Sequence, residues 1–159
     1  MNLTVVSVGK IRETYLADAI REYSKRLSRY CRLEIVEVPD EPTPDKAGEA
    51  LEAQIKQKEG QRILRALRED DYVIALAIEG KKLDSESFAG KLEQLGIEGR
   101  SNVTFVIGGS LGLSPEVLKR ADFKLSFSDL TFPHQLMRVI LLEQIYRSYR
   151  IIRHEPYHK

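Results

Sequence analysis

The sequence predicts an α/β fold in which a mostly parallel β-sheet carries helices on both faces. Strand patterns and helix patterns alternate along the 159 residues, which is typical of such folds. Residues 72–78 and 103–107 form almost continuously apolar runs, and runs of this kind indicate strands that are covered on both faces. A chain of this length fills one hydrophobic core, so we expect a single domain that spans residues 1–159.

The first half of the chain predicts two strands and two helices. Residues 3–8 are largely β-branched and are followed by Gly9, as expected for a strand. Between residues 13 and 30, apolar side chains recur every three or four positions, which predicts one face of a helix. A second strand at 33–38 stops at Pro39. A proline-rich acidic loop follows, and a long helix then covers about residues 47–67.

The second half predicts three strands, each followed by a helix. The strands lie at 72–78, 103–107 and 123–127, and the helices at 85–95, 114–120 and 134–152. Ser114 is a good N-cap and Pro115 suits the first helical position, so these two residues mark the start of the short fourth helix. Pro133 precedes the last helix in the same way.

Two loops rich in glycine and serine follow the strands at 103–107 and 123–127. Ligands of parallel sheets bind outside the carboxyl ends of the strands, so we expect these loops to form one cleft. Gly108, Gly109 and Gly112 let a ligand approach the backbone closely. This predicts a nucleotide-like or adenosine pocket, and because no phosphate-binding glycine motif is matched, we expect no phosphate cradle. The alternative is that the glycines only make a tight turn between strand and helix.

A serine hydrolase is a second interpretation of the first loop. Residues 108–112 fit the G-x-S-x-G pattern with Ser110 as nucleophile. An acid and a base follow in hydrolase order, the acid being Asp122 or Asp129 and the base His134, His154 or His158. In a nucleophile elbow the helix begins at the serine, whereas the predicted helix begins four residues later, at Ser114. The histidines lack the spacing of metal ligands and Cys31 is the only cysteine, so we expect no metal site.

The last predicted helix is apolar almost all round over its first turns. A helix of this kind is buried on two sides. The sheet covers one side, and we expect a second copy of the chain to cover the other, which predicts a homodimer. The alternative is a central helix enclosed within one chain.

Charge distribution, the absence of targeting segments and cysteine content indicate the cellular compartment. The formal net charge is +1, but basic residues gather from Arg138 to the C-terminus. No apolar segment has the length of a signal-peptide core or a membrane span, and a single cysteine fits a reducing compartment. We therefore expect a cytoplasmic protein.

Three segments carry the most specific pattern of the chain: F-V-I-G-G-S-L-G at 105–112, L-S-F-S-D-L-T-F-P-H-Q-L-M-R at 125–138 and E-P-Y-H-K at 155–159. Together with K-E-G at 58–60, they closely resemble the ribosomal large subunit methyltransferase H family, nearly from end to end. The resemblance implies a SPOUT-type α/β fold with a C-terminal trefoil knot, and a homodimer. It also implies transfer of a methyl group from S-adenosylmethionine to N3 of a pseudouridine in a stem-loop of 23S rRNA on the assembled ribosome. A ribosome- or RNA-binding factor of the same fold without catalysis is the alternative.

The resemblance also implies which residues hold the cofactor. They are Leu76, Gly108, Phe127, Ser128, Asp129, Leu130, Thr131 and Phe132. Removal of the N3 proton points to His134, Tyr157 and His158 as candidate catalytic residues, against the alternatives of a helix-packing histidine and a frayed end. The candidate phosphate contacts are Arg138, Arg147, Arg150, Arg153 and Lys159, and the alternative is a solvated charged face.

Overall fold

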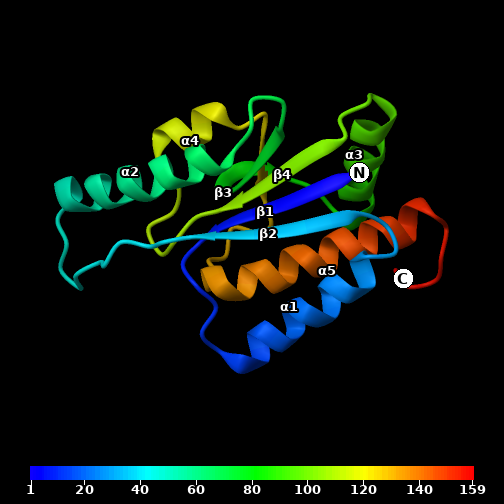
Figure 1. Cartoon of the computed structure of the whole chain (residues 1–159), viewed down its shortest axis with the longest axis horizontal. Helices are drawn as coiled ribbons and strands as arrows, with labels where there is room; N and C mark the ends of the chain where they lie inside the picture. The colour runs from blue at the N-terminus through cyan, green and yellow to red at the C-terminus, as the bar shows by residue number, and fades with distance from the viewer.

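The computed structural model describes residues 1–159 and contains five strands and five helices in alternation (Figure 1). They are β1 Asn2–Val8, α1 Thr14–Leu27, β2 Arg32–Val38, α2 Glu49–Ala66, β3 Tyr72–Lys82, α3 Ser85–Ile97, β4 Asn102–Ile107, α4 Pro115–Arg120, β5 Phe123–Ser126 and α5 His134–Ile152. The helices α4 and α5 begin at the predicted residues. The Ser114 hydroxyl caps α4 by accepting a hydrogen bond from the backbone N–H of Val117.

The five strands form one sheet in the order β2-β1-β4-β3-β5, and every neighbouring pair is parallel. The predicted α/β fold is therefore confirmed, with a sheet that is entirely parallel. Because β4, β3 and β5 are neighbours, their carboxyl ends lie side by side at one edge of the sheet. The loops that follow β4 and β5 thus flank the end of β3.

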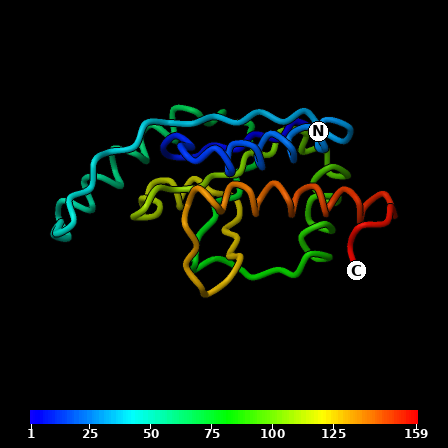
Figure 2. Tube along the Cα trace, turned by 90° about the horizontal axis from the view of Figure 1, so that it is seen from below, coloured from blue at the N-terminus to red at the C-terminus, as the bar shows by residue number.

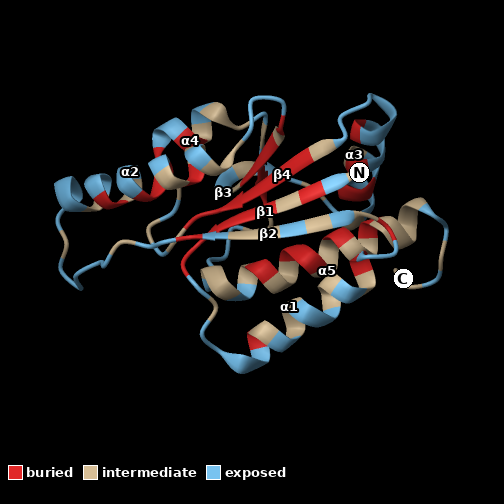
Figure 3. Cartoon of the chain, viewed as in Figure 1, coloured by how far each residue is buried: buried red, intermediate tan, exposed pale blue.

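The helices form a layer on each face of the sheet (Figure 1). One face packs against α1, α3 and α5 through a core that includes Leu3, Phe105 and Leu142. The other face packs against α2 and α4 through residues such as Val6 and Ile63. Figure 3 shows the buried residues concentrated along β1, β3 and β4, between the two layers.

The strand β3 extends beyond its predicted end. The apolar run ends at Ile78, but the strand continues to Lys82 after a shift in its register with β5 between Leu76 and Lys81. Lys81 and Lys82 pair with Leu125 and Ser126. These added residues are polar and exposed, so hydropathy gave no sign of them.

The last helix lies on the sheet between α1 and α3, which bury one side of it. On the opposite side Leu136 is 37% exposed, and Val139 and Ile140 are half-buried. An apolar strip therefore remains open at the start of α5. The homodimer and the trefoil knot stay predictions. No helix of the chain combines the length and apolarity needed to cross a membrane.

Candidate cofactor site

A cavity of about 860 Å³ lies at the carboxyl ends of β3, β4 and β5. Its walls come from the end of β3 and from the loops 108–113 and 127–133, with His134 and Met137 of α5 beside them. The two loops that the sequence singled out thus form one cleft, as predicted. They meet because β3 lies between the strands that lead into them.

The first loop, residues 108–112, is a tight turn in which the backbone at Gly108 and Gly109 lies close to the backbone of Gly112. Gly109 and Gly112 form an isolated bridge, and the N–H of Gly112 donates to the carbonyl of Gly109 at 3.1 Å. A Cβ atom at Gly108 would lie 2.8 Å from the carbonyl carbon and oxygen of Gly112. No side chain fits at Gly108, so the loop leaves bare backbone at the cavity wall.

Two serine hydroxyls hold the second loop in shape. The hydroxyl of Ser126 donates to the carbonyl oxygen of Ser128 at 3.1 Å, and the hydroxyl of Ser128 accepts from the N–H of Leu130 at 3.0 Å. Short side-chain-to-backbone bonds of this kind fix a loop locally. The loop therefore presents its backbone in a defined conformation before any ligand arrives.

Most of the expected cofactor residues line this cavity. They are Leu76, Gly108, Phe127, Ser128, Leu130, Thr131 and Phe132. Asp129 does not line it, because its exposed carboxylate forms an ion pair with Lys82 of β3. Sequence reasoning missed the two charged side chains of the wall, Lys56 and Glu79. Neither one makes an ion pair or a side-chain hydrogen bond. No local pattern marks them, since Lys56 reaches the cavity only through the packing of α2.

His134 is the first residue of α5, and it lines the cavity. Burial lowers the pKa of its imidazole, and the nearby charge of Arg138 lowers this pKa further against the opposing effect of Asp40. The imidazole is therefore neutral near pH 7. A neutral imidazole at a cavity wall can accept a proton from a bound group.

Arg138, one turn further along α5, is only 2% exposed. Its guanidinium donates to Glu37 at 2.6 Å and to the carbonyl oxygens of Val8 and Gly9 at 2.8 and 2.7 Å. The predicted contact of Arg138 with RNA phosphates does not agree with this burial. The reason is that its helix face turns inward, where the side chain ties α5 to the ends of β1 and β2.

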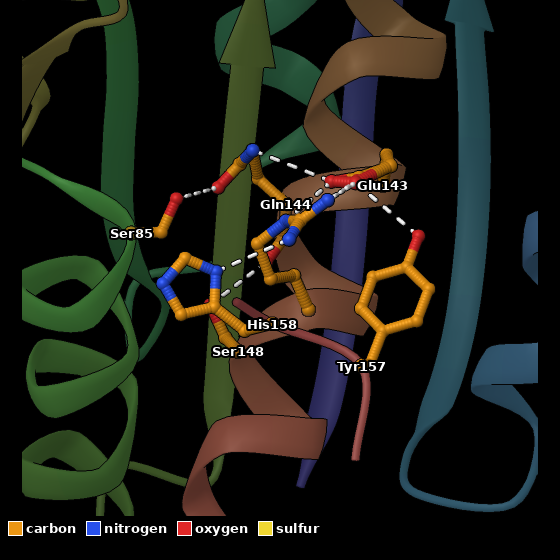
Figure 4. A network of polar contacts seen from close by, with 7 residues as sticks. Ser85, Glu143, Gln144, Ser148, Tyr157 and His158 are labelled. Atoms are coloured by element: carbon orange, nitrogen blue, oxygen red, sulfur yellow. Dashed lines mark hydrogen bonds and ion pairs between the residues drawn. The ribbon is translucent and has the colours of Figure 1, made fainter.

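The C-terminal tail is held against α5 by a polar network (Figure 4). Arg150 donates to Glu155 and to the carbonyl of Pro156, both at 2.7 Å. The ring of Tyr157 meets Tyr146 edge-on, with 4.9 Å between centroids, and the guanidinium of Arg147 lies 4.8 Å from the centroid of the Tyr157 ring. The tail therefore has a defined place in the fold rather than a frayed one.

No residue of the tail lines the cavity of its own chain. The tail folds back along the second half of α5, where the Tyr157 hydroxyl lies 3.5 Å from Glu143 and the Tyr157 ring contacts Tyr146 (Figure 2). Glu143 follows His134 by nine residues, so roughly 14 Å of helix, at 1.5 Å per residue, separates His134 from the nearest contact of the tail. His158 instead contacts Arg147, with 3.1 Å between Nδ1 and Nη1. Within one chain, Tyr157 and His158 are thus not brought together with His134.

The other cations predicted to contact RNA differ in whether an acidic side chain already pairs with them. Arg147 is paired with Glu143 and Arg150 with Glu155. Arg153 and Lys159 are exposed, and Arg153 makes only a cation–π contact with Tyr30, at 4.9 Å from the centroid. Two cations at this end of the molecule are therefore open to an anionic partner.

The hydrolase interpretation finds no support at Ser110. This residue lies in the turn before α4, five positions ahead of the first helical residue Pro115, and is exposed. No hydrogen bond joins its hydroxyl to a histidine or a carboxylate. A serine nucleophile needs a base within hydrogen-bond reach, so the arrangement lacks the essential pair.

Comparisons with known proteins agree on one family. The family described as predicted SPOUT methyltransferase matches residues 1–158. The chain is 64% identical to the ribosomal RNA large subunit methyltransferase H of Bifidobacterium adolescentis and 62% identical to ribosomal RNA large subunit methyltransferase H 1 of Clostridium perfringens. Both alignments cover 100% of this chain and 100% of the relative.

A solved structure shares the fold. It is described as a probable methylase family protein from Haemophilus influenzae Rd KW20, and it matches 99% of this chain and 70% of its own at a TM-score of 0.57 with 13% identity. Fold, full-length family match and close relatives lead to one conclusion. This chain belongs to the SPOUT methyltransferase family and, within it, to the ribosomal RNA large subunit methyltransferase H group.

Proposed function

We propose that this chain uses S-adenosylmethionine to methylate N3 of a pseudouridine in a stem-loop of 23S rRNA, on the assembled large subunit or ribosome. The observation that supports this most directly is the cavity at the ends of β3, β4 and β5, which is lined by most residues expected to hold the cofactor. The names of the full-length relatives support ribosomal RNA as the substrate class.

The cavity wall suits each part of the methyl donor. The adenosine fits against bare backbone at Gly108 and against the apolar side chains of Leu76 and Phe132. The methionine part of the donor carries a carboxylate and an ammonium group. Lys56 and Glu79, which have opposite charges and no partners of their own, would meet these two groups.

The reaction is a displacement at the methyl carbon. The N3 nitrogen attacks that carbon, the carbon–sulfur bond breaks, and its electrons neutralise the sulfonium. The proton of N3 must also leave, and in our proposal the neutral imidazole of His134 accepts it. Holding N3 in line behind the methyl group removes much of the entropic barrier, an effect worth roughly 7–11 kcal/mol in well-oriented systems.

The tail enters the proposal through a second copy of the chain. Since one chain holds Tyr157 and His158 against the second half of α5 and outside its own cavity, we propose that a homodimer places the tail of one protomer beside the cavity of the other. The open apolar strip with Leu136, Val139 and Ile140 would be covered in this dimer. Arg153 and Lys159 would then lie beside the cavity and contact RNA phosphates.

Methyl transfer to ribosomes tests the function directly. Ribosomes from cells that lack this protein are incubated with the purified protein and S-adenosylmethionine, and the 23S rRNA is mapped by mass spectrometry. We expect one added methyl group on one pseudouridine. A non-catalytic RNA-binding factor would leave the rRNA mass unchanged, which would overturn the proposal.

A further inference from the structure

We propose that Glu59 of α2 is a positioning residue, whose buried carboxylate sets the conformation of the loop 108–112 and thereby the affinity for the methyl donor. This inference rests on the proposed function. It concerns a side chain that does not itself line the cavity. Glu59 belongs to the K-E-G segment at 58–60, for which the proposed reaction gives no role.

The Glu59 carboxylate lies between two loops and is only 4% exposed. Its Oε2 accepts a hydrogen bond from the N–H of Glu41, at 3.0 Å, in the acidic loop after β2. Its Oε1 lies 3.1 Å from the position that a Cβ of Gly109 would take, and Val8 Cγ1 lies 3.2 Å from the same position. Gly109 is therefore held between Glu59 and Val8.

A carboxylate in this place is costly for the fold. Burial raises the pKa of Glu59, and the nearby cation Arg62 makes its ion pair with Glu41 and donates to the carbonyl of Pro39 at 2.9 Å. Glu59 is thus left with one hydrogen bond and no ion pair. An apolar side chain would fill the same space at lower cost. The carboxylate therefore points to a role beyond packing.

The neighbouring residue Gly60 extends the contact to the other end of the same loop. A Cβ at Gly60 would lie 2.3 Å from the hydroxyl oxygen of Ser114, the N-cap of α4. The pair Glu59 and Gly60 thus touches the segment 109–114 at both ends. Because this segment forms one wall of the cavity, α2 fixes the wall before the donor binds. A preformed wall spares the donor the entropy loss of ordering a loop.

Donor binding by Glu59 variants tests this role. We expect Glu59→Ala to weaken the Kd for S-adenosylmethionine about tenfold in calorimetry, whereas Glu59→Gln, which keeps the size and the acceptor oxygen, stays within about threefold of the natural protein. In steady state Glu59→Ala raises KM for the donor while kcat at saturating donor changes by less than about threefold. The matched control is Glu49→Ala, an exposed glutamate at the start of the same helix.

A second substitution, at Gly109, tests the contact between Glu59 and the loop 108–112 from the side of the loop. Gly109→Ala forces a methyl group against Glu59 and Val8, so we expect the donor affinity to fall about tenfold, and to fall by no more than about threefold when Glu59→Ala is already present. Gly90→Ala is the control, since a Cβ there meets nothing within 4 Å.

The outcomes separate the two proposals. Normal donor affinity in folded Glu59→Ala, or strictly additive losses in the double variant, would overturn the positioning role. Should Glu59→Ala fail to fold, normal affinity in Gly109→Ala overturns it equally. If the natural protein binds no S-adenosylmethionine at all, the proposed function itself is wrong.

Discussion

At the scale of single residues, His134 carries the most direct prediction about catalysis. The lowered pKa of its buried imidazole keeps it neutral and able to accept the N3 proton. We expect His134→Asn to lower kcat by about 10²–10⁴-fold, the usual contribution of a general base, while the Kd for the donor stays within about twofold. The measurement is methylation of ribosomes at saturating donor.

The pH dependence gives the same prediction a second readout. The kcat of the natural protein should fall as the pH drops below the pKa of His134, because the protonated imidazole cannot accept a proton. This acid limb should be absent from His134→Asn. His154→Asn, which changes an exposed histidine, is the control, and an unchanged acid limb in His134→Asn would remove His134 from the reaction.

Lys56 carries a prediction about donor recognition. It is the only lysine or arginine that lines the cavity. We expect Lys56→Met to raise the Kd for S-adenosylmethionine about tenfold, because a charge-assisted hydrogen bond to the donor is lost. The Kd for 5′-methylthioadenosine should rise by less than about twofold. The second ligand lacks the amino-acid part of the donor. Equal loss for both ligands in calorimetry would contradict the assignment, and Lys58→Met, which lies outside the cavity, is the control.

At the scale of elements, α5 is anchored to the sheet by Arg138. Its guanidinium satisfies two carbonyl oxygens at the end of β1 and pairs with Glu37 of β2, whose Oε2 also accepts from the N–H of Ile11. We expect Arg138→Met to destabilise the fold by about 3 kcal/mol, which lowers Tm by roughly 6–12 °C for a chain of this size. Thermal unfolding measures this.

The control for Arg138 is Arg153, the residue that follows the last residue of α5. Arg153 is exposed, so Arg153→Met should change the free energy of unfolding by less than about 0.5 kcal/mol. An unchanged Tm in Arg138→Met would show that the buried ion pair and its carbonyl contacts contribute nothing net. A loss smaller than about 3 kcal/mol would mean that new apolar contacts of the methionine offset part of the lost ion pair and hydrogen bonds.

The elements also show what the sequence can predict. The spacing of apolar residues predicted the strands and helices, because each of these elements buries one or both of its faces. Capping residues such as Ser114 also marked where a helix begins. The polar end of β3 was missed, since Lys81 and Lys82 join the sheet through backbone pairing and not through buried apolar side chains. Arg138 was misjudged and Lys56 was missed for a related reason. Helix packing decides whether a cation points inward, and no local pattern encodes that packing.

At the scale of the whole molecule, the fold separates two parts of the proposed site. The cavity lies at the start of α5, and the tail packs against the second half of this helix (Figure 2). In the tail, burial and the charge of Glu143 raise the pKa of Tyr157, which keeps the phenol neutral and suited to stacking rather than to proton removal. A shared site therefore assigns the base to one protomer and the stacking surface to its partner.

Subunit mixing tests whether the site is shared. One variant lacks residues 157–159, and the other carries Gly108→Ala, whose added Cβ would clash with the backbone of Gly112 at 2.8 Å. Each is expected to be inactive alone. Heterodimers purified through a different tag on each variant contain one complete site, made of an intact cavity and the tail of the other protomer, so we expect about half the activity of the natural dimer.

The reciprocal heterodimer makes this result decisive. It joins a natural protomer to one that carries both changes, so the intact cavity faces a missing tail and the intact tail faces a blocked cavity. We expect no activity from it. If each tail served the cavity of its own chain, the pattern would reverse: the reciprocal heterodimer would keep about half the activity and the first would have none. Activity in the reciprocal heterodimer alone would therefore contradict the shared site and require the tail to move from the second half of α5 to the cavity within one chain.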